Sequence, residues 1–245
     1  MPPDTLLADV VATTGTVAAT RARSTKVAAL ADLLARLQGD ELPVVVAFLA
    51  GAPRQGRIGI GWRTVAAIEV APAGEPAVTV LELDRTLDAL AGLRGPGSQK
   101  ARTDLLTALF ERATEAEADL VRRLLTGELR HGALEGLATD ATARAFAVPL
   151  AAVRRAAMLA GDLPRVAVIA RDRGEEGLTS VGLTVLRAVQ PMLAQTASDV
   201  AEADLEGGLV AGRGADVAAR QLGERRKRPP RALLVKRRRR DVARI

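Results

Sequence analysis

The residues best suited to hold a ligand lie in a basic, glycine-rich segment, R-G-P-G-S-Q-K-A-R, at residues 94–102. Its glycines and proline predict the end of one helix. Ser98 is expected to be the N-cap of the next helix, because its hydroxyl can accept a hydrogen bond from an N–H group of the first turn. The free N–H groups at a helix start can bind phosphate, and Lys100 and Arg102 would add positive charge there. This segment therefore predicts a phosphate-binding helix start.

A second basic turn follows at Arg130, His131 and Gly132. Between the two turns, leucines at a spacing near 3.6 predict two amphipathic helices, and Thr114 with Glu117 predicts a capping box at the start of the second one. Two basic turns in one helical hairpin favour a surface that holds a phosphate backbone. The alternative is two ordinary helix–helix joints with solvated basic side chains.

The composition excludes several kinds of site. The 245 residues include no cysteine and one histidine, so a disulfide framework, a thiolate metal site and a histidine zinc site are excluded. No apolar run approaches the roughly 18 residues of a membrane span. The N-terminus lacks the basic region of a signal peptide, so we expect a cytoplasmic protein with no membrane partner.

The positive charge of the chain is concentrated at its C-terminal end. Residues 213–245 contain 13 Lys and Arg against 3 Asp and Glu, whereas the whole chain has a net charge of only +6. The other residues therefore have a net charge of −4, since they hold 22 Lys and Arg against 26 Asp and Glu. A role in nucleic-acid binding for the body of the chain must rest on local basic patches.

Apolar residues at helical spacing recur from Asp4 to Ala170, and no run favours a strand. We expect an all-α fold: a single domain of about twelve short helices over residues 1–186. A linker over 187–202 and a basic, disordered tail over 203–245 should follow, and the chain should be irregular from Arg171 to Thr184. The clearest expected helices cover residues 4–19, 24–37, 40–51, 79–93, 98–110, 114–127, 134–146, 148–161 and 162–170.

Residues 51–62, G-A-P-R-Q-G-R-I-G-I-G-W, form a glycine-rich loop that Arg54, Arg57 and Arg63 flank. A dinucleotide fingerprint is excluded because no strand–glycine–helix unit surrounds the loop. We expect Trp62 to be a core or loop anchor rather than a base-stacking residue.

Other polar residues are weaker candidates. His131 is expected to face solvent or nucleic acid, because a catalytic base needs a positioned partner. Glu128 and Glu135 are expected to be exposed helix charges rather than metal ligands. No catalytic, cofactor-binding or metal-binding residue is predicted. A further basic patch and a solvated face are equally compatible with Arg21, Arg23 and Lys26.

Several segments together resemble the N-terminal DNA-binding domain of ATP-dependent DNA ligases of the actinobacterial type. The resemblance covers about residues 5–200 and includes R-I-G-I-G-W at 57–62. The other segments are R-G-P-G-S-Q-K-A-R-T-D-L-L, T-E-A-E-A-D-L-V-R-R-L-L-T-G-E-L-R-H-G-A-L-E-G, V-R-R-A-A-M-L-A-G-D-L and P-M-L-A-Q.

The resemblance implies an all-helical, monomeric domain that clamps nicked double-stranded DNA during strand joining in repair, replication or recombination. Backbone contacts would come from Ser98, Lys100, Arg102 and Arg130. The resemblance also implies that Gly97 and Gly132 allow helix ends to approach phosphate closely. It further implies Arg154 and Arg155 as additional cations.

Full-length members of the family use ATP and Mg²⁺ and form an adenylate on the lysine of a Lys-x-Asp-Gly motif. None of the four lysines here lies in that motif. We therefore expect no cofactor in this chain and hypothesise a ligase truncated before its adenylation domain, with the reading frame lost near Ala203. The alternatives are a helical module that binds an acidic partner, and an active ligase with an unrecognised lysine.

Overall fold

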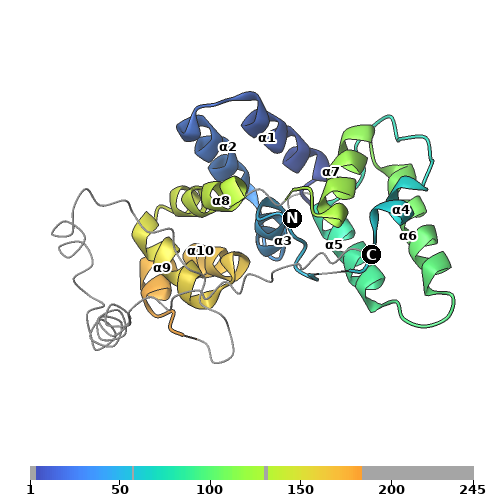
Figure 1. Ribbon diagram of the computed structural model, residues 1–245. Helices are drawn as coiled ribbons and strands as arrows, with labels where there is room; N and C mark the ends of the chain where they lie inside the picture. The colour runs from blue at the N-terminus through green and yellow to red at the C-terminus, as the bar shows by residue number, and fades with distance from the viewer. Residues whose placement is uncertain (1–3, 57, 130–131, 184–245) are drawn as a thin grey trace, which may run out of the picture. The chain divides into compact units, whose positions relative to one another are not determined.

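The computed structural model describes residues 4–56, 58–129 and 132–183, which form ten α-helices (Figure 1). The only β-type pairing among these residues is an isolated antiparallel bridge between Leu6 and Thr79. The all-α prediction is confirmed, with ten described helices where about twelve were expected. The helices are α1 (Leu7–Ala19), α2 (Arg23–Arg36), α3 (Glu41–Leu49), α4 (Trp62–Ala66), α5 (Val80–Gly92), α6 (Ser98–Arg112), α7 (Glu115–Thr126), α8 (Gly132–Ala145), α9 (Leu150–Ala160) and α10 (Leu163–Thr179).

Residues 1–192 and 193–245 form separate units, and the second unit lies outside the described residues. The expected linker over 187–202, the expected tail over 203–245 and the proposed loss of frame near Ala203 also lie outside them. No helix in the described part of the chain is long and apolar enough to cross a membrane.

Helix α3 forms the centre of the core. Eight of its nine residues are buried, which explains why its V-V-V-A-F-L sequence is apolar on every side rather than along one stripe. Helices α10 and α5 both pack against it. Burial of each such Val, Leu or Phe side chain contributes about 1.5–3 kcal/mol, so α3 fixes the positions of the helices around it.

Helix α5 connects this core to α6. Its residues Leu83, Leu87 and Leu90 are fully buried at the i, i+4, i+7 spacing of one helix face. The helix packs against both α3 and α6. Backbone hydrogen bonds from Leu7 N to Val78 O (2.8 Å) and from Val80 N to Thr5 O (2.9 Å) fix its start to the N-terminal segment. The turn that leads into α6 therefore extends from a well-anchored helix.

One sequence prediction about helices is wrong, and one short helix was not predicted. The chain does not become irregular at Arg171, because α10 continues to Thr179 with a kink at Gly174 (φ 57°, ψ −149°). Leu178 is fully buried and holds the last turn against the core. The short helix α4 was not predicted, since five residues are too few to show a helical period.

The predicted capping box at the start of α7 is confirmed. Thr114 N donates to Glu117 Oε2 (2.8 Å), and Glu117 N donates to Thr114 Oγ1 (3.4 Å). Glu117 is completely buried, so these bonds satisfy groups that water cannot reach.

We predict that Thr114→Ala lowers the free energy of unfolding by about 1 kcal/mol, because it removes an N-cap acceptor. Chemical denaturation with circular dichroism measures the change. Thr139→Ala is the control, since the Thr139 hydroxyl bonds only to the Glu135 carbonyl of its own helix. An equal loss of stability in both variants would contradict a specific capping role.

Candidate nucleic-acid interface

The start of α6 has the geometry of an uncapped helix end. Gly97 is the N-cap residue, with φ 81° and ψ −10°, a left-handed conformation that favours glycine. The prediction that Ser98 is the N-cap is wrong: Ser98 is already the first helical residue, and its N–H group donates to Gly95 O at 3.2 Å. No side chain in the described residues caps this end. The first turn therefore presents N–H groups of the kind that bind phosphate.

The two cations of this turn have different environments. The Lys100 side chain is 82% exposed and forms an ion pair with Asp104 one turn later, at 2.7 Å. Exposed pairs of this kind contribute little and exchange partners easily. Arg102 is partly buried, and its Nη2 donates to Leu93 O at 3.0 Å. Lys100 is thus available to an external anion, while Arg102 shapes the turn between α5 and α6.

The second basic turn is only partly described. Arg130 and His131 lie outside the described residues, and Gly132 is the first residue of α8. Helix α8 packs against α2 and α9, whereas α6 packs against α5. Figure 1 shows the start of α8 well separated from the start of α6. A surface shared by Lys100 and Arg130 therefore stays a prediction.

Arg154 and Arg155 have partners within the fold. Arg154 Nη2 lies 3.1 Å from Asp140 Oδ1, and Arg23 Nη2 lies 2.7 Å from Asp140 Oδ2. The side chain of Asp140 is only 13% exposed, so this carboxylate ties α2, α8 and α9 together. Arg155 Nη1 donates to the carbonyls of residues 179 and 181, at 3.4 and 3.3 Å, and thereby fixes the segment that follows α10.

Helix α4 lies beside the start of α6, a contact that the sequence did not predict. Gln99 Nε2 donates to Thr64 Oγ1 at 3.1 Å, which places α4 next to this helix end. Arg63 on α4 is exposed. The available signal was the group of arginines around the glycine-rich loop, but the sequence did not show which helix the loop would meet.

The expectation that Trp62 anchors the core or the loop is wrong, because its side chain is 61% exposed. The inward positions in this stretch belong to Ile58, Ile60 and Val65, which are at most 8% exposed. These three smaller side chains provide the anchoring that was expected of the tryptophan.

The glycine-rich loop is fixed to α5 by one buried carboxylate. Arg54 Nη2 lies 2.5 Å from Asp84 Oδ2 and 3.0 Å from Asp88 Oδ2. Gln55 Nε2 donates to Asp84 Oδ1 at 2.8 Å. The hydrogen bond to Asp84 raises the pKa of the Arg54 guanidinium above its ordinary value, so Arg54 keeps its charge. The Asp84 side chain is only 5% exposed, and these bonds compensate for its burial.

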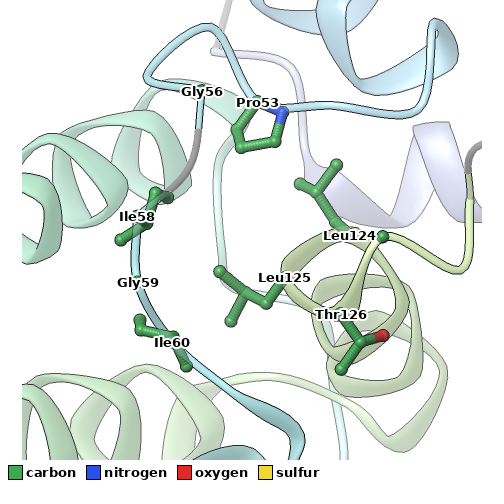
Figure 2. A pocket seen from close by; sticks show the side chains of 9 residues that line it. Pro53, Gly56, Ile58, Gly59, Ile60, Leu124, Leu125 and Thr126 are labelled. Atoms are coloured by element: carbon green, nitrogen blue, oxygen red, sulfur yellow. The ribbon is translucent and has the colours of Figure 1, made fainter.

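A pocket of about 340 Å³ separates the loop from the end of α7. Figure 2 shows Leu125 projecting from α7 toward Ile58 and Ile60 of the loop. None of the nine lining residues carries an ionisable side chain. This pocket therefore offers no acid–base chemistry. In the described part of the chain, no group of three or more His, Cys, Asp or Glu side chains is placed to hold a metal ion.

Comparison with known proteins identifies the relatives of this chain. Residues 69–143, which include α5, α6 and α7, match the family described as DNA ligase N terminus. A probable DNA ligase of Rhodococcus opacus is 52% identical over 198 residues, which are 81% of this chain and 39% of that protein. The chain is a relative of the N-terminal region of DNA ligases.

Further relatives of this ligase region are also probable DNA ligases. The protein of Saccharopolyspora erythraea is 50% identical over 205 residues, which are 84% of this chain and 40% of the relative. The protein of Anaeromyxobacter is 51% identical over 199 residues, which are 80% of this chain and 38% of the relative. This ligase-related chain spans about two fifths of the length of the relatives it matches.

We predict that Arg54→Ala lowers the free energy of unfolding by about 1–3 kcal/mol, because it leaves the buried Asp84 carboxylate short of donors. Denaturant titration measures the loss. Arg85→Ala is the matched control, since Arg85 is exposed on the same helix as Asp84. Equal denaturation midpoints for Arg54→Ala and the parent chain would show that the ion pair between Arg54 and Asp84 does not hold the loop.

Proposed function

We propose that this chain binds nicked duplex DNA through the phosphate backbone, as the DNA-binding part of an ATP-dependent DNA ligase. The observation that carries the proposal is the uncapped start of α6, with Lys100 beside it, inside the region that matches the DNA ligase N terminus. Phosphate contacts position a protein on DNA without reading sequence. The binding would therefore suit nicks in any sequence, as strand joining in repair, replication or recombination requires.

The proposed contact surface begins at Gly97 and Ser98. The Ser98 N–H already donates to Gly95 O, so the N–H groups of Gln99 and Lys100 would approach one phosphate, and the Lys100 side chain would pair with the next. Arg102 would support this turn from behind through its bond to Leu93 O. Exposed Arg63, held nearby through the bond between Gln99 and Thr64, would extend the positive surface.

The other candidate DNA-binding residues have different roles. Arg130 and Gly132 stay candidate DNA contacts at the turn before α8. We assign Arg154 and Arg155 to the stability of the fold, because Arg154 pairs with the largely buried Asp140 and Arg155 donates to backbone carbonyls, whereas the partner of Lys100 is itself exposed.

ATP and Mg²⁺ would serve the full-length ligase rather than these residues. None of the four lysines lies in a Lys-x-Asp-Gly motif, and no cluster of three acidic or histidine side chains occurs in the described residues. The residues present do not fit either group, so no step of strand joining is assigned to this chain.

The test is a mobility-shift titration of residues 1–200 with a nicked duplex that carries a 5′-phosphate and a 3′-hydroxyl. Removal of the basic C-terminal residues is necessary because they would bind any polyanion. We expect a shifted complex whose affinity falls steeply with salt. The absence of any complex at low salt would contradict DNA binding and would favour a module for an acidic protein partner.

We predict that Lys100→Ala weakens duplex binding and reduces the slope of log K against log salt by about one. Asp104→Ala is expected to strengthen binding, because it frees Lys100 and removes a negative charge from the same surface. Binding isotherms at several salt concentrations measure both effects.

Arg154→Ala is the matched control for this prediction, since it removes the same charge from a residue that is bound to Asp140. We expect it to leave the salt slope unchanged. If the slope falls for Arg154→Ala and not for Lys100→Ala, the phosphate contacts lie on α9 and the proposed surface is wrong.

A further inference from the structure

Trp62 is the largest apolar side chain exposed on the described surface. It is 61% exposed, although the chain contains a single tryptophan, no tyrosine and three phenylalanines. A single exposed apolar residue is common and by itself has no meaning. The exposed glycines and cations around Trp62, however, indicate that it contacts a ligand.

The backbone that leads to Trp62 carries no side chains on its outer side. Ile58 and Ile60 point into the body and are buried, whereas Gly59 and Gly61 are exposed between them. Gly61 has an ordinary extended conformation, φ −94° and ψ 164°, and an added Cβ would meet nothing within 4 Å. The fold itself thus does not require glycine at position 61. A glycine there leaves room for a ligand to approach the backbone beside the indole ring.

The charges around Trp62 fit a nucleic acid. Arg63 is exposed beside it, and the bond from Gln99 to Thr64 holds α4 against the start of α6. Lys100, which is 82% exposed, belongs to the same helix start. An aromatic side chain among cations, with bare backbone next to it, has the components of a base-stacking contact on a phosphate-binding surface.

The number of exposed aromatic side chains indicates which nucleic acid fits. Proteins that follow a single strand stack successive bases on several aromatic residues. Here Trp62 is the one exposed aromatic residue in the described part of the chain, since Phe48 and Phe110 are buried and Phe146 is partly buried. One aromatic residue suits one base. In duplex DNA a single base becomes accessible where a strand is interrupted, because the missing phosphodiester bond lets the bases on either side of the break unstack.

We propose that Trp62 stacks on the base at a strand interruption and gives this chain its preference for nicked over intact duplex. This inference rests on the proposed DNA binding and adds to it the residue that distinguishes the two forms of DNA. Phosphate contacts alone would bind both forms equally.

The test uses the complete chain, in which tryptophan emission reports on Trp62 alone. Acrylamide quenching of that emission is measured with saturating nicked duplex and with an intact duplex of the same sequence. Binding itself is measured separately by the anisotropy of labelled DNA, with the complete chain and with residues 1–200, because the basic C-terminal residues would bind any polyanion. We expect the nicked duplex to shield Trp62 from acrylamide several-fold more than the intact duplex does.

Three variants accompany the quenching experiment. Trp62→Ala should weaken binding to nicked duplex by about 5- to 150-fold, the range for loss of one stacked base, and leave binding to intact duplex unchanged. Trp62→Phe should retain most of the preference. Leu183→Ala is the control, because Leu183 is the other large exposed apolar residue of the described chain, at 71% exposure. It should retain the parent affinity for both duplexes.

The outcomes separate this inference from the proposed function. If both duplexes bind but acrylamide reaches Trp62 equally in both complexes, the stacking assignment is overturned and DNA binding stands. The same holds if Trp62→Ala weakens binding to both duplexes equally. If neither duplex binds residues 1–200, the proposed function fails and the stacking assignment fails with it.

Discussion

The structure of the candidate interface depends on the buried carboxylate of Asp84. This side chain is only 5% exposed, and an unpaired charge at that position would cost several kcal/mol. Arg54 and Gln55 satisfy it from the glycine-rich loop. The same contacts that compensate for burial of the charge therefore fix the loop on α5. Because α5 also packs against α6, one helix holds both the loop and α6, and the bond from Gln99 to Thr64 places α4 beside the start of α6.

Two sets of basic residues in the described chain have different roles. One set donates to groups of the chain itself: Arg54 to Asp84, Arg23 and Arg154 to Asp140, and Arg155 to carbonyls after α10. These residues tie helices together and leave little capacity for a ligand. The other set is Lys100 and Arg63, which are exposed at the start of α6 and on the adjacent α4; the ion pair of Lys100 is with the exposed Asp104. This separation explains how a body with more acidic than basic residues can hold a local site for a polyanion.

The sequence predicted well those features that depend on residues close together in the chain. The capping box needs only Thr114 and Glu117, three positions apart, and the apolar run of α3 is contained in nine residues. Contacts between distant residues were not predictable. The bond from Gln99 to Thr64 joins residues 35 positions apart, and nothing in either segment indicates the other. Ser98 resembled an N-cap, but Gly97 takes that position because glycine adopts the left-handed conformation readily.

In the proposed interface, the start of α6 and the neighbouring α4 form a single surface for nicked DNA. Amide hydrogen exchange of the complete chain, with and without nicked duplex, tests it most directly. We expect slower exchange in residues 58–65 and 97–102 upon DNA binding and unchanged exchange in α9. Slower exchange in α9 and α10, with no change at the start of α6, would contradict it.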